Sequence, residues 1–360
     1  MNELPIPDPS LIALPGPVWL FQALLLAIFI LHLLLMNLVL GGSMVSAVHL
    51  FRGRSRPGER ELALTLAKTL PVAMAMTITF GVPPLLFIQA LHGRLFYSSS
   101  ILTAWPWLTI VVFLVVAYYG FYVLSMKGEN WEQYAPWFAV LSAVLLFLVG
   151  ATFTSNLTLM QTPERYQQAY NSTFLGLYLN LSDPTMVPRF LHIFLAALAV
   201  TGAFLALRHR REKPKRNVGL GWFAGATLGQ VPVGLWFLFA LPEDLTETVL
   251  EYSLFGLPYF WIMIAVAALA LLHFVGAFFA RDKTLPIIEG SALLLVTIVL
   301  MAGMRTVLRQ AYLEPVYQLD SRVAAQWGPL ALFAVTLIIG LVAVGWLIRA
   351  YRRSLIRASS

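Results

Sequence analysis

The sequence predicts an all-α integral membrane protein whose nine helices cross the bilayer, with the N-terminus outside and the C-terminus inside. Three observations support this prediction. Hydrophobic residues make up 59% of the 360 residues. Charged residues make up only 11%, against roughly 25% in ordinary soluble domains. Apolar stretches of membrane-spanning length recur along the whole chain, so a soluble globular protein is excluded.

The predicted spans follow from the thickness of the bilayer, because about 30 Å of hydrocarbon requires about 20 helical residues. Nine stretches reach that length: Val18–Val48, Leu64–Leu91, Ile101–Ser125, Pro136–Met160, Pro188–Leu207, Leu220–Leu241, Tyr259–Ala280, Leu285–Leu308 and Leu330–Ala350. Residues 1–360 are therefore predicted to form a single membrane domain. Its parts are a periplasmic N-terminus (1–17), helices one to five (18–208), a basic cytoplasmic loop (209–219), helices six to nine (220–350) and a cytoplasmic tail (351–360).

The basic residues predict the orientation of these spans. With the N-terminus outside, 18 of the 24 Lys and Arg residues fall on the inner side and 6 on the outer side. This is a strong positive-inside bias. It explains the net charge of +7 without nucleic acid as a partner, and it predicts a multi-pass protein of a bacterial cytoplasmic (inner) membrane, with the lipid bilayer as its surroundings.

The chain contains no cysteine, which excludes disulfides, Cys-ligated zinc or iron–sulfur centres, thiol nucleophiles and covalent c-type haem attachment. Six histidines remain as candidate ligands. Two of them, His49 and His209, adjoin the basic inner loops, and His92 lies in a predicted outer turn. We expect these three histidines to be structural.

The other three histidines, His32, His192 and His273, lie within predicted spans, where an imidazole is costly and usually has a partner, a water path or a metal. One interpretation is an interhelical hydrogen bond; the other is axial ligation of a haem b. His192 and Met263 lie at similar shallow depths, which suits His–Met ligation, although methionine is also a common core residue. His32 and His273 both lie roughly 20 Å in, at a rise of 1.5 Å per residue, which permits a bis-His site.

Fixed charges at the outer side fit the same interpretation. Arg189, Arg305 and Arg309 are candidates to bind haem propionates through bidentate hydrogen bonds, with interfacial snorkelling as the alternative.

Carboxylates lie at the predicted outer mouth of the bundle. Glu243, Asp244 and Glu247 are candidates to accept protons from a quinol, and simple solvated acids are the alternative.

These residues resemble those of subunit I of the cytochrome bd quinol oxidases. The family's active-site haem histidine precedes a Leu-Gly by eight positions, as His32 precedes Leu40-Gly41. The other similar segments are Arg189-Phe190-Leu191-His192 for the low-spin haem histidine, Phe260-Trp261-Ile262-Met263 for the methionine ligand, Leu241-Pro242-Glu243-Asp244 at the end of the sixth helix, and Leu308-Arg309-Gln310-Ala311-Tyr312. The resemblance implies nine helices, haem ligands at His192, Met263 and His32, and a second membrane subunit as partner.

Departures from that family shape the predicted function. The family's third helix carries two glutamates that serve the oxygen site, whereas Ile101–Tyr119 contains no acid. The family's long quinol-binding loop is reduced here to about 15 residues, and Trp261 replaces the arginine before the methionine ligand. Within a predicted span the sole acid is Glu289, near its inner end, so no path for protons to an oxygen site is evident.

We therefore predict a haem b-binding membrane subunit, with two haems, of a respiratory quinol:cytochrome c-type oxidoreductase. Electrons would pass from membrane quinol to a periplasmic c-type or multihaem cytochrome. Two alternatives stay open. One is a divergent bd-type quinol oxidase that reduces oxygen, and the other is a haem-free membrane anchor or transporter subunit.

Overall fold

The computed structural model describes residues 13–173, 176–280, 284–315 and 323–359. Within these ranges, nine helical segments are long and apolar enough to cross a membrane. The prediction of an all-α protein with nine spans is therefore confirmed. Most of the predicted N-terminal segment, residues 1–12, lies outside the described residues.

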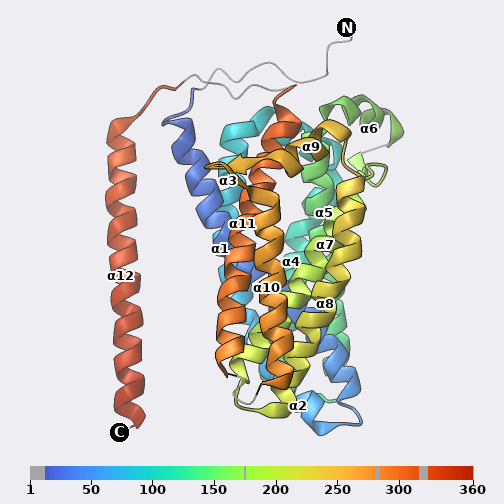
Figure 1. Ribbon diagram of the computed structural model, residues 1–360, viewed down its shortest axis with the longest axis vertical. Helices are drawn as coiled ribbons and strands as arrows, with labels where there is room; N and C mark the ends of the chain where they lie inside the picture. Colours follow the sequence, from blue (N-terminus) through green and yellow to red (C-terminus); the bar gives the residue numbers. More distant parts are fainter. Residues whose placement is uncertain (1–12, 174–175, 281–283, 316–322, 360) are drawn as a thin grey trace.

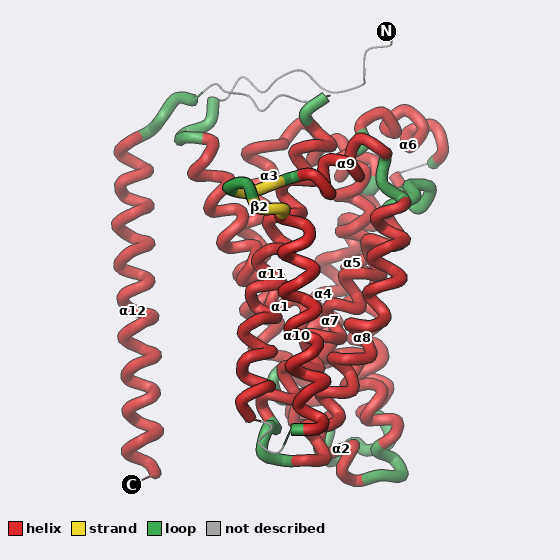
Figure 2. The backbone as a smooth tube through the Cα atoms, in the orientation of Figure 1, coloured by secondary structure: helices red, strands yellow, loops and turns green. Residues whose placement is uncertain are grey.

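The long helices run roughly side by side along the molecule (Figure 1). Their bounds are α1 Val18–Arg52, α3 Leu70–Leu102, α4 Ala104–Lys127, α5 Ala135–Gln161, α7 Met186–Arg208, α8 Lys213–Phe239, α10 Tyr259–Phe279, α11 Thr284–Leu313 and α12 Trp327–Ser359. Short elements connect them: α2 Pro57–Ala67, the 3-10 helix η1 Pro163–Arg165, α6 Tyr166–Ser172 and α9 Glu243–Glu251. A two-stranded antiparallel hairpin, β1 Ser253–Leu254 and β2 Leu257–Pro258, follows α9 (Figure 2).

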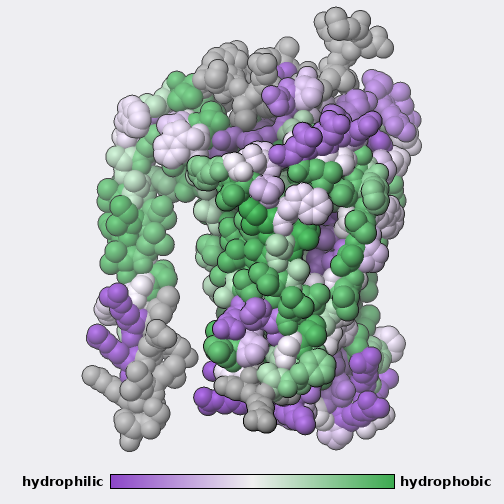
Figure 3. Space-filling view, viewed as in Figure 1, coloured by the Kyte–Doolittle hydropathy of each residue, from purple (hydrophilic) through white to green (hydrophobic). Residues whose placement is uncertain are grey.

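One end of the bundle carries α6 and α9 and is called the α9 end; the other carries α2 and is called the α2 end (Figure 1). The basic loops meet at the α2 end, where Lys68 pairs with Glu129 at 2.6 Å and Lys215 pairs with Glu61 at 2.7 Å. An apolar surface lies between the more polar ends (Figure 3). This distribution agrees with a bilayer around the middle of the bundle, and the assignment of the α2 end to the cytoplasm stays a prediction.

Most helix boundaries differ by a few residues from the sequence prediction, and larger differences occur in α3 and α8. A turn was predicted at His92, but α3 continues through it to Leu102, with only a kink at His92 (φ −131°, ψ 32°). The backbone therefore leaves helical geometry at His92, where the turn was predicted, but the helix does not end there. It resumes at once because Leu91, Leu95 and Phe96 are buried in the core on both sides of the break. Helix α8 begins at Lys213, well before the predicted Leu220, with a proline in its first turn, where proline is favoured.

Helix α1 occupies a central position and packs on α3, α5 and α7. Helices α7 and α8 cross closely at Gly202 and Gly219, where a Cβ on Gly219 would lie 2.7 Å from the Gly202 carbonyl oxygen. These packed helices fix the frame in which the candidate site residues lie. Helix α12 stands apart from the other helices (Figure 1), and none of its 18-residue apolar window is buried.

Candidate functional site

His192 lies near the α9 end of α7 and faces α8. Its ring packs against Gly234, where a Cβ would lie 3.4 Å from two ring atoms. The Gln230 amide nitrogen lies 3.4 Å from Nε2 of His192 and 3.5 Å from its carbonyl oxygen. Its Nδ1 atom is buried and makes no hydrogen bond to any residue that the structure describes. The imidazole therefore sits in a glycine-lined recess with an unused polar atom.

Arg189 lies one turn before His192 and is held by polar and aromatic neighbours. Its Nη1 donates to Gln161 Oε1 at 2.8 Å, and its Nη2 donates to Thr185 Oγ1 at 3.4 Å. Its guanidinium lies over the rings of Phe237, at 5.2 Å, and Tyr312, at 5.8 Å. The buried Nε atom of Arg189 has no hydrogen-bond partner within the described ranges.

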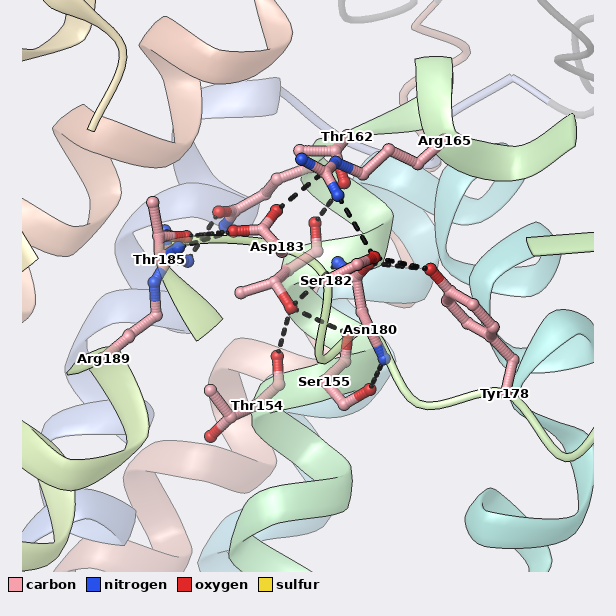
Figure 4. Close-up of polar contacts among 12 residues, drawn as sticks. Thr154, Ser155, Thr162, Arg165, Tyr178, Asn180, Ser182, Asp183, Thr185 and Arg189 are labelled. Carbon is pink, nitrogen blue, oxygen red and sulfur yellow. Dashed lines mark hydrogen bonds and ion pairs between the residues drawn. The ribbon is translucent and has the colours of Figure 1, made fainter. Parts of the chain in front are cut away.

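The segment before α7 holds this arginine in place through a polar network (Figure 4). Asp183 Oδ1 accepts hydrogen bonds from the backbone N–H of Thr185 at 2.8 Å and from its hydroxyl at 2.7 Å. The same carboxylate lies 3.8 Å from Nε of Arg165. Farther back, the backbone N–H of Asn180 donates to Ser155 Oγ on α5 at 2.8 Å. These contacts fix the first turn of α7 against the end of the bundle.

Arg305 and Arg309 on α11 complete a cationic cluster with Arg189. Arg309 is only 4% exposed, and its Nε atom has no hydrogen-bond partner in the described part of the chain. Arg305 lies over the ring of Phe29, 4.5 Å from its centroid. It is also close enough to Arg189 and Arg309 for electrostatic repulsion between the three charges. Among the described residues, none of the three takes part in an ion pair.

Arg309 is buried and the other two arginines are partly buried. Such a cluster with no ion-paired carboxylate among the described residues is unfavourable in an apolar surrounding, because removing charge from water costs several kcal/mol per ion. Asp183 acts on Arg189 electrostatically, but its oxygens are engaged by Thr185 and Arg165. The geometry therefore suits an anionic group with more than one oxygen.

His32 faces α3 rather than α7. Its Nδ1 lies 2.9 Å from the carbonyl oxygen of Thr77, and its ring fills the space over Gly81, where a Cβ would lie 2.8 Å from it. Because a carbonyl oxygen only accepts, this hydrogen bond requires the proton on Nδ1 and leaves Nε2 as the basic nitrogen of the neutral ring. The ring of Phe29 lies 6.2 Å away, so His32 neighbours the Arg305 side of the cationic cluster.

Met263 is 7% exposed and belongs to a hydrophobic cluster at the α9 end. Leu245 and Val249 of α9 cover this cluster, and Phe237 of α8 packs against it. The ring of Phe237 also contacts the guanidinium of Arg189, which lies over it. Met263 and Arg189 therefore both lie near Phe237, at the end of α8 that faces His192.

His273 has partners of another kind. Its Nδ1 lies 2.8 Å from the carbonyl oxygen of Leu269, and its Nε2 lies 3.5 Å from Glu289 on α11. The predicted pairing of His273 with His32 is not supported by these contacts, because the two rings face different helices and both nitrogens of His273 have partners. Equal depth from the helix starts does not specify the direction of a side chain, so ligation of iron by His273 stays a prediction.

The predicted proton acceptors lie on α9. Glu243, Asp244 and Glu247 are exposed, whereas Leu245 and Val249 point into the cluster that contains Met263. These carboxylates thus stand on the outward face of a helix that covers the end of the bundle.

Gln230, Gly234, Gln161 and Phe237 shape the site without having been predicted from the sequence. Gln230 gave a usable signal, because an amide in the middle of an apolar span has an interhelical partner as a rule. The others are ordinary residues whose role depends on the register between helices. No group of three His, Asp or Glu side chains within the described ranges could hold a bare metal ion.

Comparison with known proteins shows a similarity of fold but no similarity of sequence to a described family. No protein-family description matches the sequence, and no curated protein matches it. The fold is similar to a chain of the bd oxidase from Geobacillus thermodenitrificans, with a TM-score of 0.73 and 12% sequence identity, over 95% of this chain and 100% of that chain. At this identity the likeness establishes the fold alone. The chain is a multi-pass membrane protein with the fold of a bd oxidase chain.

Proposed function

We propose that this chain is a haem b-binding membrane subunit of a respiratory quinol:cytochrome c-type oxidoreductase. The observation that carries the proposal is the cationic cluster of Arg189, Arg305 and Arg309 near His192, which forms no ion pair with any residue that the structure describes. The two propionates of a haem would supply anionic oxygens to these arginines, and the His192 imidazole nearby could ligate its iron. The bd oxidase fold supports the same choice of cofactor.

In this proposal, His192 and Met263 would hold the iron of one haem, and His32 would hold a second. When bound, the haems supply one-electron redox chemistry. The chain's own contribution is positional. Gly234 leaves room beside the His192 ring, and the carbonyl oxygen of Thr77 holds His32 in the tautomer that leaves Nε2 free to bind. His273 is left out of this ligand set because of its contacts with Leu269 and Glu289.

The α9 end is the proposed place of quinol oxidation and of electron transfer to a partner. Glu243, Asp244 and Glu247 would accept the protons that a quinol releases, and a periplasmic c-type or multihaem cytochrome would dock nearby. Exposed carboxylates on α9 support both roles, since they are accessible to protons and to the positive rim of a partner. The unburied apolar surface of α12 supports contact with a second membrane subunit.

The proposed location is a bacterial inner membrane with the α2 end inside. The meeting of the basic loops at the α2 end supports this orientation, because cytoplasmic loops carry an excess of Lys and Arg.

The proposal is tested by a pyridine-haemochrome assay and a redox-resolved visible spectrum of the purified protein. His192→Ala should remove the low-spin b-haem absorbance, and Met263→Leu should change its ligation. His209→Ala, at the opposite end of α7, is the matched control and should leave the spectrum unchanged. Full low-spin absorbance in His192→Ala would refute the ligand assignment.

The bd oxidase fold also favours a second candidate function, reduction of oxygen. Cyanide-resistant oxygen uptake driven by quinol would establish it, whereas a purely six-coordinate haem spectrum without oxygen uptake supports the electron conduit. A colourless protein without extractable haem would leave a haem-free anchor or transporter subunit as the function.

A further inference from the structure

A second candidate site lies at the α2 end, away from the α9 carboxylates. A cavity of about 510 Å³ opens there between α1, α2, α7 and α8. Its volume falls within the range of about 300–1,000 Å³ that is usual for small-molecule sites. Its lining combines polar and charged side chains with apolar side chains and glycines.

The polar group consists of three side chains from three helices. His49 on α1 is 1% exposed, and its Nδ1 pairs with the carboxylate of Glu59 on α2. The indole Nε1–H of Trp222 on α8 donates to Nε2 of His49 at 2.8 Å. Because an indole only donates, Nε2 must be the acceptor and the proton lies on Nδ1, toward Glu59. His49 Nε2 and Trp222 Nε1–H are therefore each other's partners, and a ligand hydroxyl reaches both only by entering between them.

The charges at the mouth balance each other, since Arg52 lines it together with Glu59. This local neutrality favours an uncharged polar headgroup over a phosphate or a carboxylate, because an anion would meet the Glu59 carboxylate.

The deeper wall of the cavity is open on the side of α8. Gly221 and Gly225 are exposed, and a Cβ at either position would meet no atom within 4 Å. Leu195 and Leu198 of α7 line the opposite wall. The two glycines stand four residues apart on one face of α8, about 6 Å along its axis. A molecule dissolved in the bilayer can therefore enter sideways between helices.

We propose that this groove binds the ring of a quinone or quinol, with its isoprenoid chain leaving past Gly221 and Gly225 into the lipid. A quinol hydroxyl that enters between the two side chains replaces their mutual hydrogen bond, because it donates to His49 Nε2 and accepts from Trp222 Nε1–H. A quinone carbonyl makes only the contact with Trp222, so the groove binds the quinol more tightly than the quinone. This site is separate from the quinol oxidation proposed at the α9 end, and its occupancy does not depend on bound haem.

The groove reaches toward the centre of the proposed haem site. Its deep residues Leu195 and Ala226 lie three and four residues from His192 and Gln230, which is about 5–6 Å along each helix. A quinone ring in the groove is therefore placed on the inner side of His192, opposite to Met263 and α9.

Photolabelling and fluorescence binding test the proposal on the purified full-length protein. An azido derivative of decylquinone should label peptides within residues 195–226. The quinol mimic 2-heptyl-4-hydroxyquinoline N-oxide should bind with at least tenfold lower affinity at this site in Gly225→Leu, because the leucine fills the groove. Gly276→Leu on α10 is the matched control, since a Cβ there also meets no atom within 4 Å, and it should leave labelling and binding unchanged.

A second variant guards against misfolding of Gly225→Leu. Trp222→Phe keeps an aromatic ring and removes only the donor, which should lower the affinity about fivefold, the usual effect of one hydrogen bond. Equal affinity in wild type, Gly225→Leu and Trp222→Phe would overturn the proposal. Labelling confined to the α9 end would also overturn the proposal. So would a phospholipid in the groove that excess decylquinone fails to displace. A haem-free preparation that still labels at residues 195–226 would contradict the proposed function and support this site.

Discussion

Replacement of Gly219 by alanine is expected to separate α7 from α8. A Cβ on Gly219 would lie 2.7 Å from the carbonyl oxygen of Gly202 and 2.9 Å from Cα of Ala206, whereas ordinary contact begins at 3.4 Å. The backbone nitrogen of Ala206 would lie closer still, so the helices must move apart by more than about 0.7 Å, against backbone atoms that cannot rotate away. Overpacking of this kind typically costs about 1–3 kcal/mol, and we expect that decrease in the free energy of unfolding.

The assay is reversible unfolding in mixed micelles, followed by circular dichroism over a denaturing-detergent titration. Gly276→Ala is the control, because its Cβ would meet nothing within 4 Å, and its free energy of unfolding should stay within about 0.5 kcal/mol of wild type. If Gly219→Ala were as stable as Gly276→Ala, the close crossing of α7 and α8 would be refuted. The positions of Gly234 and Gln230 relative to His192 would then also lose their support.

Three further outcomes are expected. Asn156→Ala removes two hydrogen bonds, to the hydroxyls of Ser100 and Thr103 at the α3–α4 junction. It should lower the free energy of unfolding by about 1 kcal/mol, because one hydrogen bond in a membrane contributes about 0.6 kcal/mol. An unchanged free energy of unfolding would contradict these hydrogen bonds. Hydrogen bonds from Lys215 and His209 lower the pKa of Glu212 from 4.5 to about 2. The depressed pKa means that the carboxylate's stabilising contribution is present above pH 4.5 and is lost as the pH falls toward 2. Carbon-13 NMR of Glu212 should show a midpoint near 2 that rises in Lys215→Ala, and an ordinary midpoint in the wild type would disprove the contact. Arg309→Met should reduce haem retention during purification, measured as haem per chain, because it removes a cation from the cluster; full retention would argue against propionate binding there.

The nine spans were predictable because bilayer thickness demands long apolar stretches, and each of these stretches became a helix. The continuation of α3 beyond His92 was not, because the polar His-Gly-Arg sequence resembles a loop while Leu91, Leu95 and Phe96 are buried on both sides of the break. Tertiary burial outweighed the local signal there.

Part of the candidate site was also predictable. Arg189 and His192 are three residues apart, so helical periodicity places them on neighbouring parts of one face. Their partners were not predictable, since Gln230 and Gly234 approach His192 through the register of α7 on α8, which depends on Gly202 and Gly219. The His273 side chain points toward Glu289 because of the rotation of α10 about its axis. The position of a residue along its helix does not define that rotation.

The cationic cluster has a consequence for the biogenesis of the protein. If the cluster binds an anionic cofactor as proposed, a chain that folds before the cofactor arrives has a native state that is less stable than the loaded one by the free energy of ligand binding. The unloaded chain is then the form that membrane proteases recognise first. Cofactor supply would therefore control how much of the protein accumulates in the membrane, in addition to how much of it is active.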